Sequence, residues 1–494
     1  MIQMSALFEC AGIEPDVLEG KAEIERLSAD SRHVDSSTLF ISMPSQTSDG
    51  MAYLKEAISK GVAAVLVHSE KGLEVARLEG VPRAAMIDEG LRFPELVWRL
   101  CRAFYKNPTK TMKVVGVTGT NGKTTVAWLI RDMIQNLGEK AGYLGTLGFQ
   151  IPGISRELPN TTPFSVDLMA LLAEARDREV QALSIEVSSH ALDQRRIDGV
   201  DFDAAVFTNL SQDHLDYHGS MEAYAQAKFR LFRELGPRSG KNFMAALNVG
   251  DKYGKVWSQE LGSNVLTFGL RGADLVGKAL SVELNKIQLQ LAYEGDKIVT
   301  EVPLGGSFNV QNCLSAAAGM ICLGYSLEQI GKALTGVRPV PGRFEPVPND
   351  KGIGIIVDYA HTPDALQKLL DSVRQLHPAR IVTVFGCGGD RDKTKRPKMA
   401  KAASERSDMV VLTSDNPRSE DPVQILKDVE SGLVPGVDAC CIIDRREAIE
   451  YTLKKAHPGD VVVIAGKGHE NYQIIGRTKY PMDDREIARE ALKV

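Results

Sequence analysis

The sequence predicts an α/β protein of three domains. The chain has 494 residues, and a typical domain has roughly 100–200 residues. Short apolar runs alternate with helical patterns along residues 112–340 and again along 341–494, which is typical of βαβ units with parallel sheets. A polar stretch with a proline at 105–111 predicts a linker after an N-terminal domain of residues 1–111.

The first two domains differ in their predicted elements. In the N-terminal domain, strands at 38–43 and 62–67 and a helix at 51–60 predict a small α/β unit. In the central domain, the strand 113–118 precedes a glycine loop, a helix over 124–136 and further strands at 182–187 and 204–208. Residues 275–304 alternate apolar and polar, which predicts an antiparallel appendage.

The C-terminal domain is predicted to be a Rossmann-like, doubly wound sheet. Its strands are expected at 354–357, 380–385, 409–413 and 460–465, with helices around 364–376, 395–406, 422–431 and 446–456.

Composition and charge exclude several classes of protein. The net charge is -5, so no broad basic field is available to bind nucleic acid. No run of about 18 apolar residues occurs and the N-terminus lacks a signal-peptide pattern, so we expect no membrane span and a cytoplasmic protein. The seven cysteines form no CxxC pair, so neither a disulfide framework nor a zinc site is expected.

The strongest local signal is the glycine loop after the strand 113–118. Backbone N–H groups of such a loop bind phosphate together with the helix N-terminus. Lys123 would reach the β- and γ-phosphates of ATP, and the Thr124 hydroxyl would bind Mg²⁺. Val117 occupies the first glycine position of the strict motif, which is therefore met only in part. The central sheet is thus predicted to be of the P-loop ATPase type, with ATP bound by Gly119, Thr120, Asn121, Gly122, Lys123, Thr124 and Thr125.

Polar residues also follow two other predicted strands. Glu186 and His214 are candidates to bind Mg²⁺ or phosphate, because ligands of doubly wound sheets lie beyond the carboxyl ends of the strands. Lys228 lies in a helical pattern at 222–232, where composition alone predicts a solvated side chain.

These segments together resemble the Mur ligase family, with motifs in order along nearly the whole chain. The matching segments are GTNGKTT at 119–125, EVSSH at 186–190, TNLSQDHLDYHG at 208–219, Lys228, GSFNVQN at 306–312, GRFE at 342–345, DYAHTPD at 358–364, FGCGGDRD at 385–392, DNPR at 415–418 and AGKGHE at 465–470.

The resemblance implies an ATP-dependent ligase that forms an amide bond. ATP would phosphorylate the carboxylate of a UDP-linked muramoyl dipeptide, and the amine of an incoming amino acid would attack the acyl phosphate. The implied catalytic residues are Lys123, Lys228, His214 and Glu186, with Asn312 facing the adenine and Arg343 the phosphates. By resemblance, Lys228 carries a carbamate derived from CO₂ and binds a second Mg²⁺ near His214, whereas Thr124 and Glu186 bind the first.

The resemblance also implies two binding regions for the UDP-muramoyl dipeptide. The uridine end would contact Ala29, Ser31, Gln46, Thr47 and Ser48, although Pro44 stands where the family usually has glycine. The muramoyl peptide would contact Thr161, Thr162, Ser188, Gln194 and Arg196. Read without the family, the two threonines are as well explained by helix capping ahead of Val166.

The amino acid is predicted to be meso-diaminopimelate. The implied binding residues are Arg391, Asp415, Asn416, Pro417, Arg418, Gly466 and Glu470. Arg418 offers paired donors to a distal carboxylate that lysine lacks, and Glu470 can pair with the distal ammonium. The segment 415–417 also suits a turn, and L-lysine remains an alternative acceptor.

Two further alternatives are a folylpolyglutamate synthase-like ligase and a catalytically silent scaffold. The first shares the ATP loop, but residues 1–110, Thr161 with Thr162, and the DNPR motif argue against it. The second would be expected to lack the phosphate-loop lysine or the acidic and histidine cluster, and both are present. We expect a monomer.

Overall fold

The computed structural model describes residues 1–43, 51–86 and 92–493. The chain divides into two compact units, and each is described by itself. The first unit comprises Met1–Thr267 and Ala318–Tyr325, and the second comprises Phe268–Ala317 and Ser326–Val494. The predicted domain boundaries near residues 111 and 340 stay predictions.

The N-terminal part of the first unit has the predicted α/β character. Its five-stranded sheet has the order β2 (Val17–Glu19), β7 (Arg83–Ala85), β6 (Ala64–Val67), β5 (Thr38–Ile41) and β4 (Arg26–Ser28). The accompanying helices are α1 (Met4–Cys10), α2 (Met51–Ser59), α3 (Glu70–Leu78) and α4 (Arg92–Phe104). Strands β4 to β7 are parallel and β2 is antiparallel, and the predicted strands and helix are confirmed within two residues.

The predicted linker is a packed segment of the first unit. Pro108–Thr111 forms a 3₁₀ turn with Pro108 and Thr109 buried. The Thr109 hydroxyl accepts a hydrogen bond from the backbone N–H of Asp201 at 3.0 Å. Both guanidinium Nη atoms of Arg102 donate to the Asp201 carboxylate at 2.8 and 2.9 Å. Arg102 of α4 and Thr109 of this segment therefore both bind Asp201, next to the central sheet.

The central sheet of the first unit brings three strand ends to one edge. Strand β8 (Lys113–Thr118) lies between β12 (Ala182–Glu186) and β13 (Ala204–Phe207), and all three are parallel. The sheet continues through β9 (Ala141–Gly145), β10 (Gly148–Ile151) and β11 (Ile154–Arg156) on one side and β14 (Met244–Asn248) and β15 (Val265–Gly269) on the other. Since parallel strands end at the same edge, the loops after β8, β12 and β13 meet there.

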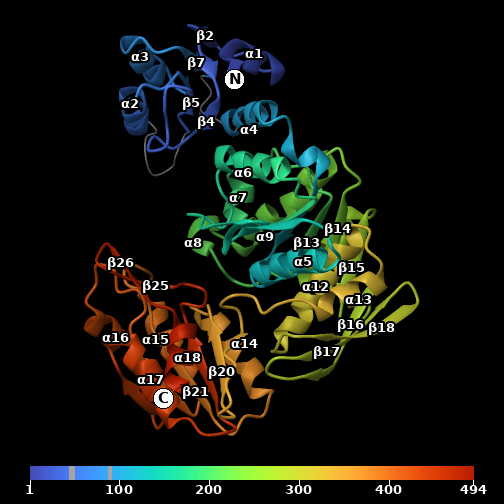
Figure 1. Cartoon of the computed structure of the whole chain (residues 1–494), viewed down its shortest axis with the longest axis vertical. Helices are drawn as coiled ribbons and strands as arrows, with labels where there is room; N and C mark the ends of the chain where they lie inside the picture. The colour runs from blue at the N-terminus through green and yellow to red at the C-terminus, as the bar shows by residue number, and fades with distance from the viewer. Residues whose placement is uncertain (44–50, 87–91, 494) are drawn as a thin grey trace. The chain divides into compact units, whose positions relative to one another are not determined.

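Helices of the first unit follow these strands (Figure 1). They are α5 (Lys123–Asn136), α6 (Ser165–Asp177), α7 (Ser189–Asp193), α8 (Leu215–His218), α9 (Met221–Arg230), a π-helical turn (Leu231–Leu235), α10 (Gly236–Arg238) and α11 (Lys252–Leu261).

The second unit begins with the predicted antiparallel strands. They are β16 (Leu275–Val282), β17 (Ile287–Tyr293) and β18 (Asp296–Val302). Helix α12 (Phe308–Cys322) follows, whose residues from Ala318 on belong to the first unit, and then α13 (Leu327–Thr335). On β17, Ile287, Leu289 and Leu291 are fully buried, which explains the alternation seen in the sequence.

The C-terminal sheet is doubly wound, as predicted. Its order is β19 (Glu345–Pro346), β20 (Gly354–Asp358), β24 (Val461–Ala465), β21 (Ile381–Phe385), β22 (Met409–Leu412) and β23 (Asp438–Cys441), with only β19 antiparallel. The helices are α14 (Pro363–Arg374), α15 (Lys395–Ser404), α16 (Pro422–Glu430), α17 (Arg445–Lys455) and α18 (Asp484–Leu492). A hairpin of β25 (Tyr472–Ile475) and β26 (Thr478–Pro481) precedes α18.

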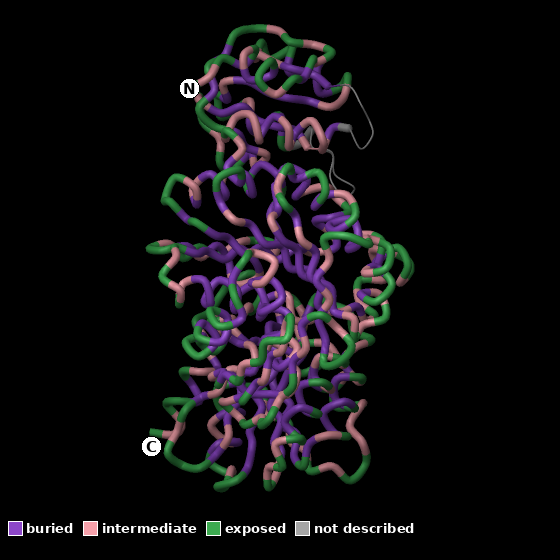
Figure 2. The backbone as a smooth tube through the Cα atoms, turned by 90° about the vertical axis from the view of Figure 1, so that its right-hand side faces the viewer, coloured by how far each residue is buried: buried purple, intermediate pink, exposed green. Residues whose placement is uncertain are grey.

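Hydrophobic cores lie on both faces of this sheet. Ile356 and Val463 belong to one core, and their neighbours Val357 and Ile464 belong to the other. Strands β21 and β24 are buried at every residue, and Figure 2 shows many loops at the outside of the tube as exposed. Strands buried on both faces read as continuous apolar runs, which is why these strands were predictable. Along the described ranges, no helix is long and apolar enough to cross a membrane.

Candidate active site

The predicted phosphate loop connects β8 to α5 and has a constrained backbone. Gly119 has φ +150°, and a Cβ there would lie 2.0 Å from the Thr208 hydroxyl oxygen. Gly122 has φ +87° and directly precedes α5. Both positions therefore need glycine, and the loop leads into a helix N-terminus, where backbone N–H groups favour anions.

The residues after β13 brace this loop. The backbone carbonyl of Asn121 accepts hydrogen bonds from Thr208 Oγ1 at 2.7 Å and Asn209 Nδ2 at 3.0 Å. Asn209 also accepts hydrogen bonds from the backbone N–H groups of Thr120 and Asn121. Sequence reasoning included Thr208 and Asn209 in a motif but assigned them no role. Their position at the carboxyl end of the predicted strand 204–208 could have indicated this role.

Two lysines converge on the phosphate loop. Lys228 Nζ and Lys123 Nζ each donate to the carbonyl oxygen of Gly119, at 2.9 Å in both cases. Lys228 is 1% exposed, so the solvated side chain predicted from composition is wrong. Burial lowers the pKa of Lys228 well below its ordinary value, and the charge of Lys123 lowers it further. The neutral amine is thereby favoured.

Glu186 lies at the end of β12 and is fully buried. Its carboxylate accepts hydrogen bonds from the Thr124 hydroxyl at 3.0 Å and the Thr146 backbone N–H at 2.8 Å. The Tyr143 hydroxyl donates a further, short hydrogen bond to Glu186. The structure therefore brings together Thr124 and Glu186, whose hydroxyl and carboxylate oxygens are of the kind that Mg²⁺ prefers. Tyr143 and Thr146 were not predicted from the sequence.

His214 lies beside two other histidines at the same edge of the sheet. It directly precedes α8 with a left-handed backbone, φ +51°. Its ring centroid lies 4.9 Å from that of His190, and the His190 centroid lies 5.6 Å from that of His218. Burial lowers the pKa of His214, and Lys123 and Lys228 lower it further. Within the described part of the chain, no three His, Cys, Asp or Glu side chains form a metal-binding group.

Several residues predicted to bind the muramoyl peptide lie next to Glu186. The Thr162 hydroxyl donates to the Glu186 backbone carbonyl at 2.7 Å and accepts from the Ser188 N–H at 3.2 Å. Arg196 donates to the Thr162 carbonyl at 2.9 Å and, twice, to the Gln194 side chain. These four residues therefore form one hydrogen-bonded group.

The capping alternative for the two threonines is wrong. Helix α6 begins at Ser165, its N-cap is Phe164, and no side chain caps it. Thr161 Oγ1 instead lies 3.2 Å from Thr146 Oγ1, which connects it to the surroundings of Glu186.

The predicted uridine-binding residues belong to the N-terminal sheet region. Ser31 is 2% exposed, and its hydroxyl donates to Glu56 at 2.6 Å. Ala29 is partly buried and follows β4. Gln46, Thr47 and Ser48, like Pro44, lie outside the described residues.

Asn312 and Arg343 belong to the second unit. Asn312 is buried in α12, and its side-chain amide donates to Asn309 Oδ1 at 2.8 Å. Asn309 donates in turn to the Gly305 carbonyl at 2.7 Å. The Arg343 guanidinium carbon lies 4.6 Å from the centroid of the Tyr359 ring. Asn309 thus orients Asn312. Asn309 lies three residues before Asn312 on the same helix face, and this spacing could have indicated its role.

The predicted amino-acid-binding residues gather beyond the carboxyl ends of β22 and β24. Asn416 Nδ2 donates to Glu470 Oε2 at 2.9 Å. Lys467 Nζ donates to both Asn416 Oδ1 and Glu470 Oε2, each at 3.1 Å. A Cβ on Gly466 would lie 2.8 Å from Asp415 Oδ2. Asp415, Asn416, Gly466 and Glu470 therefore form one group, to which the structure adds the fully buried Lys467.

Arg391 and Arg418 lie on the neighbouring loops. Arg418 follows Pro417, has φ +50°, and donates from Nη1 to the Gly389 carbonyl at 2.8 Å. Arg391 donates from Nη1 to the Asp390 carbonyl at 3.0 Å. Two cations are thus held near the polar group at the strand ends, a suitable surrounding for a carboxylate ligand.

Two family models match the chain. The Mur ligase middle domain matches residues 117–320, and the Mur ligase, glutamate ligase domain matches residues 342–468. The fold, the phosphate loop and these matches define an ATP-dependent enzyme of the ligase class. The chain belongs to the Mur ligase family.

Curated relatives match nearly the whole chain. The UDP-N-acetylmuramoyl-L-alanyl-D-glutamate--2,6-diaminopimelate ligase of Geobacillus kaustophilus is 43% identical over 96% of this chain and 96% of its own. The protein of the same name from Gloeobacter violaceus is 44% identical over 95% of this chain and 94% of its own.

Solved structures support the same three-domain fold. A UDP-N-acetylmuramoyl-L-alanyl-D-glutamate--2,6-diaminopimelate ligase structure has a TM-score of 0.69 at 34% identity, covering 99% of this chain and 98% of its own. A folylpolyglutamate synthase of Mycobacterium tuberculosis complexed with ADP has a TM-score of 0.61 at 18% identity, covering 76% of this chain and 92% of its own. The latter likeness concerns the fold alone.

Proposed function

We propose that the protein adds meso-diaminopimelate to UDP-N-acetylmuramoyl-L-alanyl-D-glutamate, at the expense of ATP, in the synthesis of peptidoglycan precursors. The observation that carries the proposal is the likeness to diaminopimelate ligases, 43% identical over 96% of the chain. The polar group around Asn416 and Glu470, with Arg418 on the adjacent loop, supports the choice of amino acid.

The first step is phosphoryl transfer to the carboxylate of the dipeptide. The loop Gly119–Thr125 would bind the phosphates of ATP, and Lys123 would leave the Gly119 carbonyl to contact the transferred group. Mg²⁺ held by Thr124 and Glu186 would neutralise charge on the phosphates and on the attacking carboxylate. The Thr162, Ser188, Gln194 and Arg196 group would orient the dipeptide.

Lys228 is proposed to act as a carbamate. Its amine nitrogen would attack the carbon of CO₂, forming an N–C bond while one C=O π pair moves to oxygen, and one proton would pass from the nitrogen to water. Burial and the charge of Lys123 favour the neutral amine that this step needs. The resulting anion would replace a cation beside the phosphate loop and supply oxygen ligands to a second Mg²⁺ near His214.

The second step forms the amide bond. The free amine of the amino acid attacks the acyl carbon, a tetrahedral intermediate forms, and phosphate leaves with the former carboxylate oxygen. The Asn416, Lys467 and Glu470 group would fix the diamino acid. Lys467 pairs with Glu470, and the guanidinium groups of Arg391 and Arg418 would offer paired donors to a distal carboxylate. L-Lysine lacks that carboxylate and would leave these donors without it.

A phosphate-release assay tests the proposal. The purified protein, ATP and Mg²⁺ are mixed with the UDP-muramoyl dipeptide and, in turn, meso-diaminopimelate, L-lysine, D-lysine and L-glutamate. We expect release to depend on both the dipeptide and diaminopimelate. Preferred use of L-lysine would identify the alternative acceptor. Release in a parallel mixture, in which a folate replaces the dipeptide and L-glutamate is the amino acid, would identify the folylpolyglutamate synthase-like alternative. No release with any amino acid would contradict the proposal.

The proposal includes a monomer that works in the cytoplasm, where ATP and nucleotide-linked precursors are available. Light scattering during size-exclusion chromatography tests the oligomeric state against the chain mass of 53.9 kDa. Fractionation of cells tests the location.

A further inference from the structure

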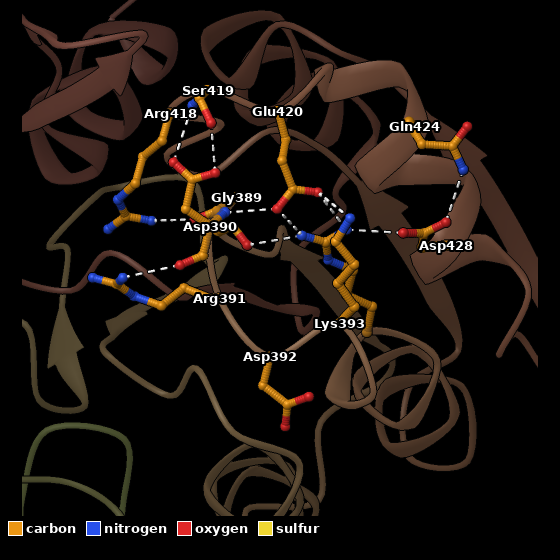
Figure 3. Close-up of polar contacts among 12 residues, drawn as sticks. Gly389, Asp390, Arg391, Asp392, Lys393, Arg418, Ser419, Glu420, Gln424 and Asp428 are labelled. Atoms are coloured by element: carbon orange, nitrogen blue, oxygen red, sulfur yellow. Dashed lines mark hydrogen bonds and ion pairs between the residues drawn. The ribbon is translucent and has the colours of Figure 1, made fainter.

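Two loops of the second unit are joined side by side, and each carries one of the two arginines (Figure 3). The first loop, residues 386–393, carries Arg391, and the second, 415–420, carries Arg418. Arg418 Nη1 donates to the Gly389 carbonyl at 2.8 Å, and the Gly389 N–H donates to the Asn416 carbonyl at 2.9 Å. The loops therefore exchange hydrogen bonds at the positions where the arginines lie.

Close backbone packing fixes the register of the two loops. A Cβ on Gly389 would lie 1.9 Å from the Pro417 carbonyl oxygen, and a Cβ on Gly388 would lie 2.9 Å from Arg418 Nη1. Asp390 and Arg418 both adopt left-handed φ, +53° and +50°. Such a conformation costs free energy in residues other than glycine and persists only where the surroundings impose it. Some interaction must therefore hold the loops in place.

Asp390 and Glu420 provide part of this interaction. The Ser419 hydroxyl donates to the Asp390 carboxylate at 2.7 Å, and the Ser419 N–H does so at 3.2 Å. The Asp390 N–H donates to Glu420 Oε1 at 2.6 Å. Glu420 on the second loop thus binds the backbone of the first loop directly, one residue before Arg391.

Arg396 is the cation that fixes Glu420. It lies in α15, and its side chain is 0% exposed. Nη1 donates to Glu420 Oε2 at 3.0 Å, Nη2 donates to Glu420 Oε1 at 2.9 Å, and Nη2 also reaches the Gly388 carbonyl at 3.3 Å. The hydrogen bond from Arg396 is the largest cause that lowers the pKa of Glu420 to about 2. One buried guanidinium therefore binds both loops.

Asp428 binds the same guanidinium from the other side. Arg396 Nη1 donates to Asp428 Oδ2 at 2.8 Å, and Gln424 Nε2 donates to Asp428 Oδ1 at 2.8 Å. Asp428 belongs to α16, and Arg396 and Gln424, which donate these hydrogen bonds to it, lie outside both loops. A buried arginine needs paired anions, so Asp428 stabilises Arg396 through hydrogen bonds that do not involve the loops that carry the arginines.

We propose that Arg396 and Glu420 are positioning residues that set the register of Arg391 and Arg418, and through it the affinity and selectivity for the distal carboxylate of the diamino acid. This proposal rests on the proposed function for its ligand. Its structural part, that Arg396 and Glu420 hold the two loops in register, does not depend on the proposed function. Neither residue contacts the ligand in this role; both act through the arginine-bearing loops.

Glu420→Gln, Arg396→Lys and the control Asp428→Asn test the proposal in the full-length enzyme. Gln keeps the size of Glu420 but removes the charge, and Lys keeps the charge but removes the paired donors. The KM values for meso-diaminopimelate and ATP, the preference for diaminopimelate over L-lysine and the Tm are measured for each. Hydrogen exchange of the peptides that contain 386–393 and 415–420 is followed by mass spectrometry.

For Glu420→Gln and Arg396→Lys, we expect the KM for diaminopimelate to rise about tenfold or more, since small displacements of binding groups weaken binding strongly. The KM for ATP should stay within about a factor of two, the preference over lysine should fall, and exchange in both peptides should accelerate. For Asp428→Asn, the Tm should fall while the KM for diaminopimelate and the exchange of the loops stay close to wild type.

Unchanged exchange and unchanged KM in Glu420→Gln would overturn the proposal, as would an equal rise of the KM in Asp428→Asn. A wild-type enzyme that ignores diaminopimelate would contradict the proposed function instead. In that case the exchange data still decide whether Arg396 and Glu420 hold the two loops in register.

Discussion

Lys123 and Lys228 donate to the same backbone carbonyl, that of Gly119, each at 2.9 Å. One lysine belongs to the start of α5 and the other to α9, more than a hundred residues further along the chain. Two ammonium groups at one acceptor repel each other, and burial disfavours the charged form of Lys228 further. The arrangement therefore supports a chemical conversion of Lys228 from a cation into an anion, and a release of Lys123 toward phosphate.

Lys228→Ala should abolish phosphate release, because the proposed carbamate and its Mg²⁺ ligands are lost. Addition of short carboxylates such as acetate should restore part of the activity by occupying the space beside Gly119. The measurement is phosphate release with increasing acetate. Lys252→Ala, which changes an exposed lysine at the start of α11, serves as the control. It should keep normal phosphate release and should gain no activity from acetate. Near-normal activity of Lys228→Ala would remove this lysine from the mechanism.

Tyr143→Phe should weaken the use of Mg²⁺. Its hydroxyl donates to Glu186, which also accepts from Thr124, so the variant removes a hydrogen bond that orients the carboxylate that the proposal assigns to the metal. Loss of a hydrogen bond to a metal ligand typically costs about 10- to 100-fold in metal affinity. The Mg²⁺ concentration that gives half-maximal activity measures the effect.

Tyr325→Phe is the matched control for this prediction. The Tyr325 hydroxyl also donates to a carboxylate, that of Glu139, at 2.7 Å, but Glu139 lies beyond the carboxyl end of α5, away from the phosphate loop. The two variants should therefore differ in Mg²⁺ dependence. An equal response of both would argue against a metal role for Glu186.

Arg418→Ala should raise the KM for diaminopimelate far more than the KM for ATP. A charge-assisted hydrogen bond contributes roughly 1.5–3 kcal/mol, which corresponds to about ten- to hundredfold in affinity. Steady-state kinetics with each substrate varied in turn measure the two KM values. Arg446→Ala, an arginine of α17 that is 48% exposed, is the control. Parallel increases of both KM values in Arg418→Ala would contradict the assignment of Arg418 to the amino acid.

The parts of the fold that were predictable are those with a local pattern. Strands such as Ile381–Phe385 and Val461–Ala465 are buried at every residue, so they appear as apolar runs. The edge strand Asp438–Cys441 is partly exposed, and every residue of Thr478–Pro481 is exposed. No residue of either strand is buried, and both strands were missed. Edge strands carry little of the hydrophobic signal that sequence reasoning uses.

The residues of the site also differ in whether a local sequence pattern predicts them. The phosphate loop is contiguous, so Gly119 and Lys123 could be predicted from spacing alone. Lys467 and Arg396 could not, because each has a partner that is distant in sequence: Lys467 binds Asn416, and Arg396 binds Glu420. Local composition assigns long cationic side chains to solvent, and only tertiary pairing explains why these two are fully buried.

The protein should lose stability as the pH falls from about 6.5 to 4. In this range His469 is protonated in the unfolded chain but not in the folded protein. Burial is the main cause that lowers the pKa of His469 to about 4, and Arg343 is the next. Its Nδ1 is buried and has no hydrogen-bond partner among the described residues. An unfolded histidine has a pKa of about 6.5, so between about pH 6.5 and 4 the unfolded chain binds up to one more proton at this residue than the folded protein.

His469→Gln isolates this contribution. Since unfolding takes up protons in this range, the free energy of unfolding decreases as the pH decreases, and the decrease should be smaller in the variant. The Tm of wild type and variant, measured from about pH 7 to 4.5, gives the difference. His33→Gln, at a side chain that is 67% exposed, controls for the removal of a histidine as such. Parallel Tm curves for wild type and His469→Gln would mean that His469 takes up its proton equally in both states, contrary to its burial beside Arg343.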